Sequence, residues 1–301
     1  MGTKMKKTHP VSWDKIFRKI TLTKIPFPSK LSEEYYEKIR YFLPNKARIL
    51  EVGSGSGEIS GYLAKKGHDV YLLDQSEVAL NLSKRLFSHY GLRGTFVHGN
   101  LFSIPFNDNV FDCVWNSGVL EHFYKKEIVK GLKEMSRVSN NLVITMVPSA
   151  KSVTYRIAKV ILEKEKKWDY GDEFPKYTLH KQFTDANLNV VKEELVGTYF
   201  GLMWLNKISR IPNDLLAELT NWAESLKEES LKEGISYLLL TIGIKKGIRG
   251  KSSGKVNYKS LVLDKEDELS QAYKKLSLIE KELKIYKNSK FWKLYKILKG
   301  I

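Results

Sequence analysis

Residues 47–52 are largely apolar and run directly into a segment with glycines at positions 53, 55 and 57. A short apolar run is typical of a buried strand, and residues 58–66 have a helical pattern that ends at Gly67. Glycine adopts positive φ angles without strain and lets the backbone approach a ligand closely where a helix begins. The segment therefore predicts a strand–turn–helix unit whose turn binds a ligand.

The alternation of strand and helix continues along the chain and is interrupted only after Pro148. Short apolar strands separated by helices predict a parallel sheet with helices on both faces. We therefore expect an α/β, Rossmann-like, doubly wound, mostly parallel seven-stranded sheet with an antiparallel edge strand. The expected strands are 47–52, 69–73, 95–97, 111–115, 142–147, 189–196 and 235–244, and the expected helices are 32–43, 58–66, 78–90, 125–136, 152–166, 183–186 and 213–232.

The positive charge is concentrated at the two ends of the 301-residue chain. The net charge is +17, from 51 basic and 34 acidic residues; residues 1–32 carry +7 and residues 245–301 carry +10, so the middle is neutral. A neutral body with basic ends favours contact between the ends and an anionic surface. The alternative is that lysine-rich ends only confer solubility.

These shifts in composition divide the chain into five parts. We expect a basic N-terminal extension, a domain that carries the sheet, an insertion or lid within it, a flexible Gly/Ser/Lys linker, and a helical tail. The tail has a short heptad pattern between Leu269 and Tyr286, which is typical of a coiled coil. The boundaries are 1–32 for the extension, 33–246 for the domain, 151–181 for the insertion, 247–260 for the linker and 261–301 for the tail.

Composition excludes several classes of protein. The chain is 42% hydrophobic and 12% aromatic, which is too much for a disordered protein. No apolar run approaches the roughly 18 residues that span a bilayer, and the basic N-terminus lacks the apolar stretch of a secretory signal. The single cysteine, Cys113, excludes an internal disulfide and a multi-cysteine metal centre. We therefore expect a cytoplasmic protein and predict no metal site.

The residue types around the glycine turn indicate the charge of the ligand. A dinucleotide site follows the pattern G-x-G-x-x-G, but Glu58 occupies the last position of that pattern here. A carboxylate at the start of a helix repels a pyrophosphate and tolerates a cation, and Glu51 adds a second acid before the turn. The pattern favours a positively charged nucleoside without phosphates and disfavours a nicotinamide dinucleotide.

Polar residues follow the other strands of the expected sheet at the points where they end. Asp74 ends the second strand, Asn100 follows the third, and Asn116 lies near the end of the fourth. An acid at the position of Asp74 accepts hydrogen bonds from both ribose hydroxyls in nucleotide-binding sheets. Because the carboxyl ends of parallel strands meet at one edge, we expect these side chains to surround one crevice.

Together these elements resemble the class I S-adenosylmethionine-dependent methyltransferases, particularly the branch that includes the ubiquinone/menaquinone methyltransferases. The resemblance covers residues 45–148 and, by strand order, 183–244, and it implies that 33–246 is the methyltransferase domain with S-adenosyl-L-methionine as cofactor. One departure is Asn100, where the family often has Asp. The cofactor-binding residues that the resemblance implies are Glu51, Gly53, Ser54, Gly55, Gly57, Asp74, Gln75, Asn100, Leu101 and Asn116.

His122 is the candidate catalytic residue. It follows the fourth strand on the cofactor side, and an imidazole that titrates near pH 6.5 can deprotonate an acceptor hydroxyl. The alternative is that His122 only packs at the start of a helix. Methyltransferases of nucleobase or glutamine amino groups resemble one another in an Asn/Asp-Pro-Pro-aromatic motif at this strand end, and the chain has Asn116-Ser-Gly-Val instead.

The end of the tail, residues 288–299, resembles the C-terminal segments of enzymes in cell-surface polysaccharide pathways. Its lysines and aromatic residues suit an anionic membrane surface, such as the inner membrane face, or a partner helix; the alternative is a helix that folds back onto its own domain. We expect O-methylation of a small molecule or of a sugar in a cell-surface or lipid-linked glycan. The alternatives are a quinone or lipid methyltransferase and a non-catalytic scaffold in glycan assembly. The tail allows a homo-oligomer through residues 261–301, and no recognition module points to nucleic acid.

Overall fold

The computed structural model describes residues 12–209, 211–226 and 229–245. The linker (247–260), the coiled-coil tail (261–301) and the first residues of the N-terminal extension, all predicted from the sequence, lie outside these residues. Among the described helices, none is long and apolar enough to cross a membrane.

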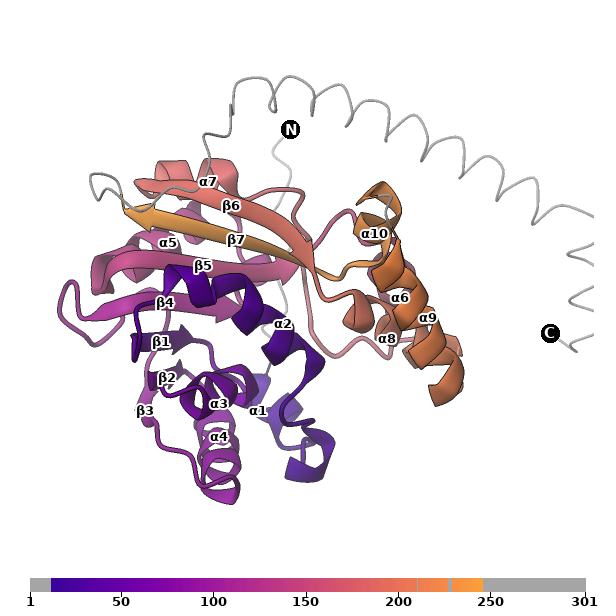
Figure 1. Cartoon of the computed structure of the whole chain (residues 1–301), viewed down its shortest axis with the longest axis horizontal. Helices are drawn as coiled ribbons and strands as arrows, with labels where there is room; N and C mark the ends of the chain where they lie inside the picture. Colours follow the sequence, from indigo (N-terminus) through magenta and orange to yellow (C-terminus); the bar gives the residue numbers. More distant parts are fainter. Residues whose placement is uncertain (1–11, 210, 227–228, 246–301) are drawn as a thin grey trace, which may run out of the picture. The chain divides into compact units, whose positions relative to one another are not determined.

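Seven strands form one sheet with the order β3-β2-β1-β4-β5-β7-β6 (Figure 1). The first five strands in the chain pair in parallel, and β7 runs antiparallel to both β5 and β6. The prediction of a mostly parallel, Rossmann-like sheet with an antiparallel pair at its edge is confirmed; β6 is the edge strand and β7 lies one strand inward. The strands are β1 (Arg48–Val52), β2 (Asp69–Asp74), β3 (Thr95–His98), β4 (Phe111–Ser117), β5 (Ser139–Pro148), β6 (Leu188–Val196) and β7 (Leu238–Lys245).

Two apolar layers cover the sheet because successive strand residues point to opposite faces. In β1, Ile49 faces the layer of α2 (Lys30–Ile39), α3 (Glu58–Lys65) and α4 (Glu77–His89). Leu50 faces the opposite layer, with α5 (Lys125–Val138) and α7 (His180–Asp185). The inner strands β1, β2, β4, β5 and β7 are mostly buried on both faces, as expected for strands between helices, whereas the edge strands β3 and β6 are largely half-buried.

The N-terminal residues from Ser12 onward pack on the domain. Helix α1 (Trp13–Phe17) contacts α4, and two short 3₁₀ helices, η1 (Leu22–Lys24) and η2 (Arg40–Phe42), flank α2. Helix α2 begins two residues before the expected position because Ser29 caps it: the Ser29 side chain accepts a hydrogen bond from the Ser32 backbone N–H at 3.1 Å. Much of the expected extension therefore belongs to the folded domain.

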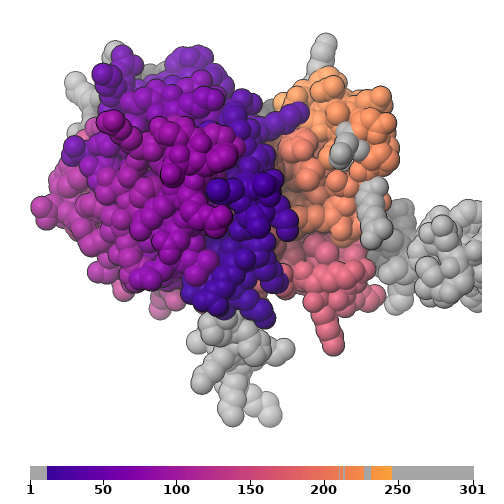
Figure 2. Space-filling model, turned by 90° about the horizontal axis from the view of Figure 1, so that it is seen from below, coloured from indigo at the N-terminus to yellow at the C-terminus, as the bar shows by residue number. Residues whose placement is uncertain are grey.

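A helical lobe adjoins the end of β5 and the beginning of β7. Helix α6 (Val153–Lys164) packs on α8 (Thr198–Ser209), followed by α9 (Asn213–Ser225) and α10 (Glu229–Ile235). Figure 2 shows the N-terminal residues, in indigo, between this lobe and the strands and helices of residues 48–138. The prediction of one helix over 213–232 is wrong: α9 and α10 are separate helices. Helix α8 was not predicted, and β7 begins at Leu238 because the chain remains helical to Ile235.

Candidate active site

The glycine turn after β1 has the conformation that its sequence predicts. Gly53, Gly55 and Gly57 all have positive φ angles, of 77°, 55° and 69°. The Gly53 N–H donates to the Leu73 carbonyl at 2.7 Å, which joins the turn to β2. A Cβ atom on Gly53 would lie 2.5 Å from Cγ2 of Val119. The turn therefore requires glycine both for its backbone conformation and for the close packing of the segment after β4.

Asp74 is fixed at the carboxyl end of β2 beside this turn. Its carboxylate accepts a hydrogen bond from the Gly55 N–H at 2.8 Å and from the Ser76 N–H at 2.8 Å. The side chain is buried, and burial raises the pKa of the Asp74 carboxyl, although the hydrogen bonds from Ser76 and Gly55 oppose the shift. Each carboxylate oxygen retains a second lone pair for a ligand. The neighbouring Gln75 is exposed, and its carbonyl accepts from His98 Nε2 at 3.0 Å.

Three buried polar atoms near the carboxyl ends of β1 and β4 lack a hydrogen-bond partner among the described residues: Oε2 of Glu51, Oγ of Ser54 and Oδ1 of Asn116. Burial raises the pKa of Glu51 well above its ordinary value, opposed by hydrogen bonds from Ser60. Buried polar groups are nearly always paired, so unpaired ones indicate a missing partner. A ligand that carries positive charge and hydrogen-bond donors fits this set of acceptors.

The other residues predicted for the cofactor differ in how they face this region. Asn100 is exposed, and its Oδ1 accepts from the Phe102 N–H at 2.9 Å, which leaves its amide N–H groups for a ligand. The Leu101 side chain is buried in the core against α5, where a Cβ on Gly131 would lie 2.7 Å from it. Leu101 can therefore contribute to a ligand site only through its backbone.

Glu58 has a structural partner that sequence analysis did not identify. Its carboxylate accepts hydrogen bonds from the Ser29 N–H at 2.8 Å and from the Ser29 hydroxyl at 2.9 Å. Glu58 thus holds the start of α2 against α3. The charge argument made for Glu58 from the sequence applies with more force to Glu51, whose Oε2 has no hydrogen-bond partner among the described residues.

Helix α1 covers the turn and reaches both halves of the site. The Phe17 ring lies against Gly55, where an added Cβ would meet Cζ at 3.1 Å. Asp14 accepts a hydrogen bond from the Ser76 hydroxyl at 2.6 Å. The Trp13 ring meets the His122 ring edge-on, with centroids 5.1 Å apart. These residues lie in the segment that the sequence predicts to be an extension. Its aromatic and acidic residues were the only sequence feature that could have indicated that the segment packs on the site.

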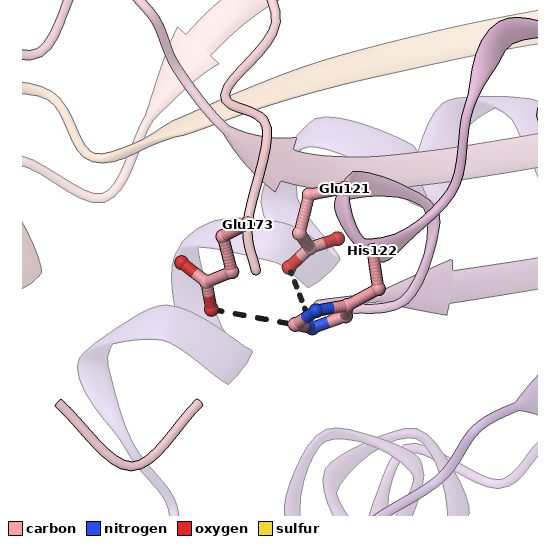
Figure 3. A group of neighbouring side chains, drawn as sticks. All are labelled: Glu121, His122 and Glu173. Atoms are coloured by element: carbon pink, nitrogen blue, oxygen red, sulfur yellow. Dashed lines mark ion pairs between the residues drawn. The ribbon is translucent and has the colours of Figure 1, made fainter. Parts of the chain in front are cut away.

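His122 ends a 3₁₀ helix after β4, η3 (Leu120–His122), and lies between two carboxylates (Figure 3). Its Nδ1 lies 3.0 Å from the Asp172 carbonyl, while its Nε2 lies 3.9 Å from Oε1 of Glu121 and 4.0 Å from Oε1 of Glu173. The His122 side chain is 13% exposed, and burial lowers its pKa. The imidazole is therefore neutral near pH 7.

Glu173 reaches this group from the insertion. Its Oε2 accepts a hydrogen bond from the Tyr155 hydroxyl at 2.5 Å, and burial raises the pKa of its carboxyl to about 7. The Phe174 N–H donates to the Glu121 carbonyl at 2.9 Å, so the insertion is joined to η3 by its backbone. Sequence analysis did not identify Glu173 or Tyr155. Aromatic rings surround Tyr155, namely Trp168, Trp204 and Tyr237.

Comparison with known proteins identifies the domain. Residues 49–141 match a family model described as a methyltransferase domain. The ubiquinone/menaquinone biosynthesis C-methyltransferase UbiE of Vibrio cholerae is 32% identical over 122 residues, which cover 38% of this chain and 43% of that protein. An uncharacterised methyltransferase of Bacillus subtilis, YodH, is 30% identical over 90 residues, which cover 30% of this chain and 37% of that protein.

A solved structure shares the fold. A chain from the complex between the Haloferax volcanii Trm112 methyltransferase activator and the protein assigned as its methyltransferase aligns with a TM-score of 0.50 and 15% identity, over 79% of this chain and 99% of that one. The match to each of these two curated relatives spans less than half of that relative's length. Residues 49–141 thus resemble the methyltransferase domain family, within a domain that has the fold of this solved structure.

Proposed function

We propose that this chain, whose residues 49–141 resemble the methyltransferase domain family, is an S-adenosylmethionine-dependent methyltransferase. The observation that carries the proposal is one hydrogen bond, which the Asp74 carboxylate accepts from the Gly55 N–H at 2.8 Å. It brings an acid to the glycine turn, at the carboxyl ends of two adjacent parallel strands. Ligands bind at this edge of open α/β sheets, and an acid there suits ribose hydroxyls.

The unpaired acceptors near the turn support a cationic cofactor. Glu51 and Ser54 would hold its positively charged amino acid part, while Asp74 would hold the ribose. Asn100 would contribute its amide N–H groups to the adenine edge. S-adenosylmethionine supplies a methyl group on a positively charged sulfur. The residues of the chain then have to position an acceptor and remove its proton.

His122 is our candidate for the group that takes the acceptor proton. The Asp172 carbonyl can only accept a hydrogen bond, so the neutral ring carries its hydrogen on Nδ1 and a lone pair on Nε2. Transfer of a methyl group to a hydroxyl releases one proton, which Nε2 would accept. General-base assistance of this kind contributes roughly 10²–10⁴-fold to a rate.

For the acceptor, we propose a hydroxyl of a small molecule or of a sugar in a surface or lipid-linked glycan. The lone pair of His122 and the half-buried rings of Trp168 and Tyr170 support an acceptor that has hydroxyls and a flat or partly apolar face. The second candidate is C-methylation of a quinone or another lipid, supported by the identity with UbiE. A scaffold without activity is the third candidate.

Calorimetry with S-adenosylhomocysteine tests the cofactor, and mass analysis with a labelled methyl donor tests the acceptor. We expect saturable one-site binding of S-adenosylhomocysteine, no binding of NAD, and loss of affinity in Asp74→Asn. Asp69→Asn is the matched control, because Asp69 lies at the opposite end of the same strand and pairs with Arg48. A chain that binds no S-adenosylhomocysteine would contradict the proposal and favour the scaffold.

A further inference from the structure

Three lone-pair donors converge beside the acceptor side of the proposed site. The Nε2 atom of His122 and one carboxylate oxygen each of Glu121 and Glu173 all lie within 4.8 Å of one another (Figure 3). The two distances from Nε2, 3.9 Å and 4.0 Å, are too long for hydrogen bonds. The side chains of Glu121 and Glu173 are only 2% and 6% exposed, so water screens the group weakly.

The orientation of the His122 ring directs Nε2 toward both glutamates. Because the Asp172 carbonyl can only accept a hydrogen bond, the ring hydrogen lies on Nδ1 and the Nε2 lone pair faces one oxygen each of Glu121 and Glu173. Three potential ligand atoms therefore face one point. An imidazole whose other nitrogen donates to a backbone carbonyl is also the usual arrangement of a metal-binding histidine.

The second oxygen of Glu121 supplies an independent observation. Glu121 is 1% exposed, and its Oε2 has no hydrogen-bond partner among the described residues. Burying a carboxylate without a partner is costly unless a cation or a proton compensates. The unpaired Oε2 of this buried carboxyl therefore needs a proton or a cation as compensation, and the ligand atoms beside its other oxygen, Oε1, favour a cation.

Nearby lysines do not supply that centre, because their ammonium groups are directed elsewhere. Lys159 pairs with Glu163, and Lys207 lies 3.8 Å from the ring centroid of Trp204. Lys176 lies 5.6 Å from the ring centroid of Phe174. All three raise the local potential and weaken cation binding, so the affinity has to come from direct coordination.

We propose that Glu121, His122 and Glu173 bind a divalent cation that coordinates the acceptor oxygen. Bonds from Zn²⁺ to nitrogen and oxygen are each about 2.1 Å, so two ligands of one ion lie up to about 4.2 Å apart. The distances from Nε2 to the two carboxylates, 3.9 Å and 4.0 Å, lie within that span, while the three atoms together lie within 4.8 Å of one another, so the side chains would draw closer together to bind one ion. Three protein ligands leave a coordination position open, as in catalytic metal sites.

This inference rests on the proposed function and makes His122 a ligand in place of a base, because a lone pair bound to a cation cannot take a proton. A cation bound to Nε2 would lower the pKa of a coordinated acceptor hydroxyl, and the proton of that hydroxyl would pass to solvent water. It also defines the acceptor class, namely molecules with an oxygen that coordinates a hard or borderline cation. The sequence predicts no such site because His122 and the insertion lie about fifty positions apart.

The test uses the full-length chain without an affinity tag, treated with EDTA and then dialysed. Calorimetry with Mn²⁺ and with Zn²⁺ measures binding. The electron paramagnetic resonance signal of free Mn²⁺ gives an independent count of the bound ions. Glu173→Gln and His122→Ala remove one ligand each. Glu165→Gln is the matched control, since Glu165 belongs to the same insertion but pairs with Lys167 at the surface.

We expect one ion per wild-type chain, and an affinity at least tenfold weaker in both ligand variants but unchanged in the control. Binding of S-adenosylhomocysteine should remain the same in all four proteins, which shows that the variants are folded. Absence of saturable metal binding, or equal binding in all variants, overturns the metal site. If S-adenosylhomocysteine still binds in that case, the proposed function stands without the metal.

Discussion

The Asp74 carboxylate accepts a hydrogen bond of 2.8 Å from the backbone N–H of Gly55, so the acid that ends β2 is fixed to the turn that follows β1. The same carboxylate accepts a second bond from the Ser76 N–H. One side chain thus shapes the turn and, in our proposal, also binds the ribose of the cofactor.

Asp74→Ala should therefore lower both stability and cofactor affinity. Hydrogen bonds to charged groups contribute about 1.5–3 kcal/mol, and the substitution leaves two backbone N–H groups without their acceptor. We expect an affinity for S-adenosylhomocysteine weaker by about tenfold or more in calorimetry, with a lower midpoint in urea unfolding. Asp69→Ala, at the other end of β2, should change neither quantity by more than a small amount. Unchanged cofactor affinity in Asp74→Ala would remove this residue from the site.

Gly53→Ala should destabilise the domain strongly. The substitution places a Cβ at a φ of 77° and 2.5 Å from Cγ2 of Val119. The left-handed conformation costs about 1–2 kcal/mol, and overpacking adds about 1–3 kcal/mol. Gly67→Ala is the control, since Gly67 also has a positive φ but nothing lies within 4 Å of an added Cβ. In urea unfolding, Gly53→Ala should lower the free energy of unfolding more than Gly67→Ala does. Adding Val119→Ala to Gly53→Ala should recover part of that loss.

His122→Ala should lower the turnover number by roughly 10²–10⁴-fold once an acceptor is known. The affinity for S-adenosylhomocysteine should stay within about twofold of the wild type, because His122 lies on the acceptor side. Stopped-time assays with labelled methyl donor and calorimetry measure the two quantities. A loss of folding without a specific effect on turnover would instead support the packing role for His122.

The sheet was predictable from sequence because its inner strands are short, apolar and mostly buried on both faces. The helical lobe was not, because residues 198–209 are apolar without a clear period, and their helical face is defined by α6, which lies far away in the chain. The division between α9 and α10 carries no glycine or proline signal near residue 226.

The cofactor half of the site was predictable for a similar reason. Gly53, Gly55 and Asp74 lie within a short stretch whose spacing follows from one strand–turn–helix–strand unit. The acceptor half depends on Trp13 and Glu173, which reach His122 from two distant segments. Neither belongs to a repeating pattern or a motif, so only the folded chain brings them to the histidine.

Arg137 is expected to secure the loop between β3 and β4 in a pH-dependent manner. Its guanidinium donates to the carbonyls of Ile104 and Phe106 and to the carboxylate of Glu134, which in turn accepts from the Ile104 N–H. The hydrogen bond from Arg137 lowers the pKa of the Glu134 carboxyl. A lowered folded-state pKa gives stability that is present above the unfolded pKa of about 4.3 and is lost as the pH falls below it.

Glu134→Gln should therefore lower the free energy of unfolding by about 1 kcal/mol near neutral pH. The value is modest because the pair of Arg137 and Glu134 is partly exposed to solvent. The difference in free energy of unfolding between this variant and the wild type, measured with urea, should shrink between about pH 5 and about pH 3. Glu127→Gln on the same helix is the comparison, because its carboxylate only accepts a hydrogen bond from the Tyr124 N–H. A difference that stays constant over this pH range would show that the ion pair does not contribute through its charge.

Truncation after Lys246 should leave the domain folded and able to bind the cofactor. Strand β7 ends at Lys245 and lies between β5 and β6, so the shortened chain retains every strand of the sheet. The removed residues, 247–301, contain fourteen basic and six acidic side chains. Each Lys or Arg near an anionic membrane contributes about 1 kcal/mol, so even part of this net charge of +8 would dominate attachment.

Co-sedimentation with vesicles that contain anionic lipid measures the attachment. The full chain should bind at low salt and detach at high salt, since the Debye length falls to about 3 Å at 1 M. The truncated chain should not bind, and a full-length variant with glutamine at positions 290, 293, 296 and 299 should bind more weakly while keeping the aromatic residues of the tail. Equal sedimentation of the full and truncated chains would contradict membrane attachment. A truncated chain that fails to fold would instead show that the tail packs on its own domain, because no strand of the sheet has been removed.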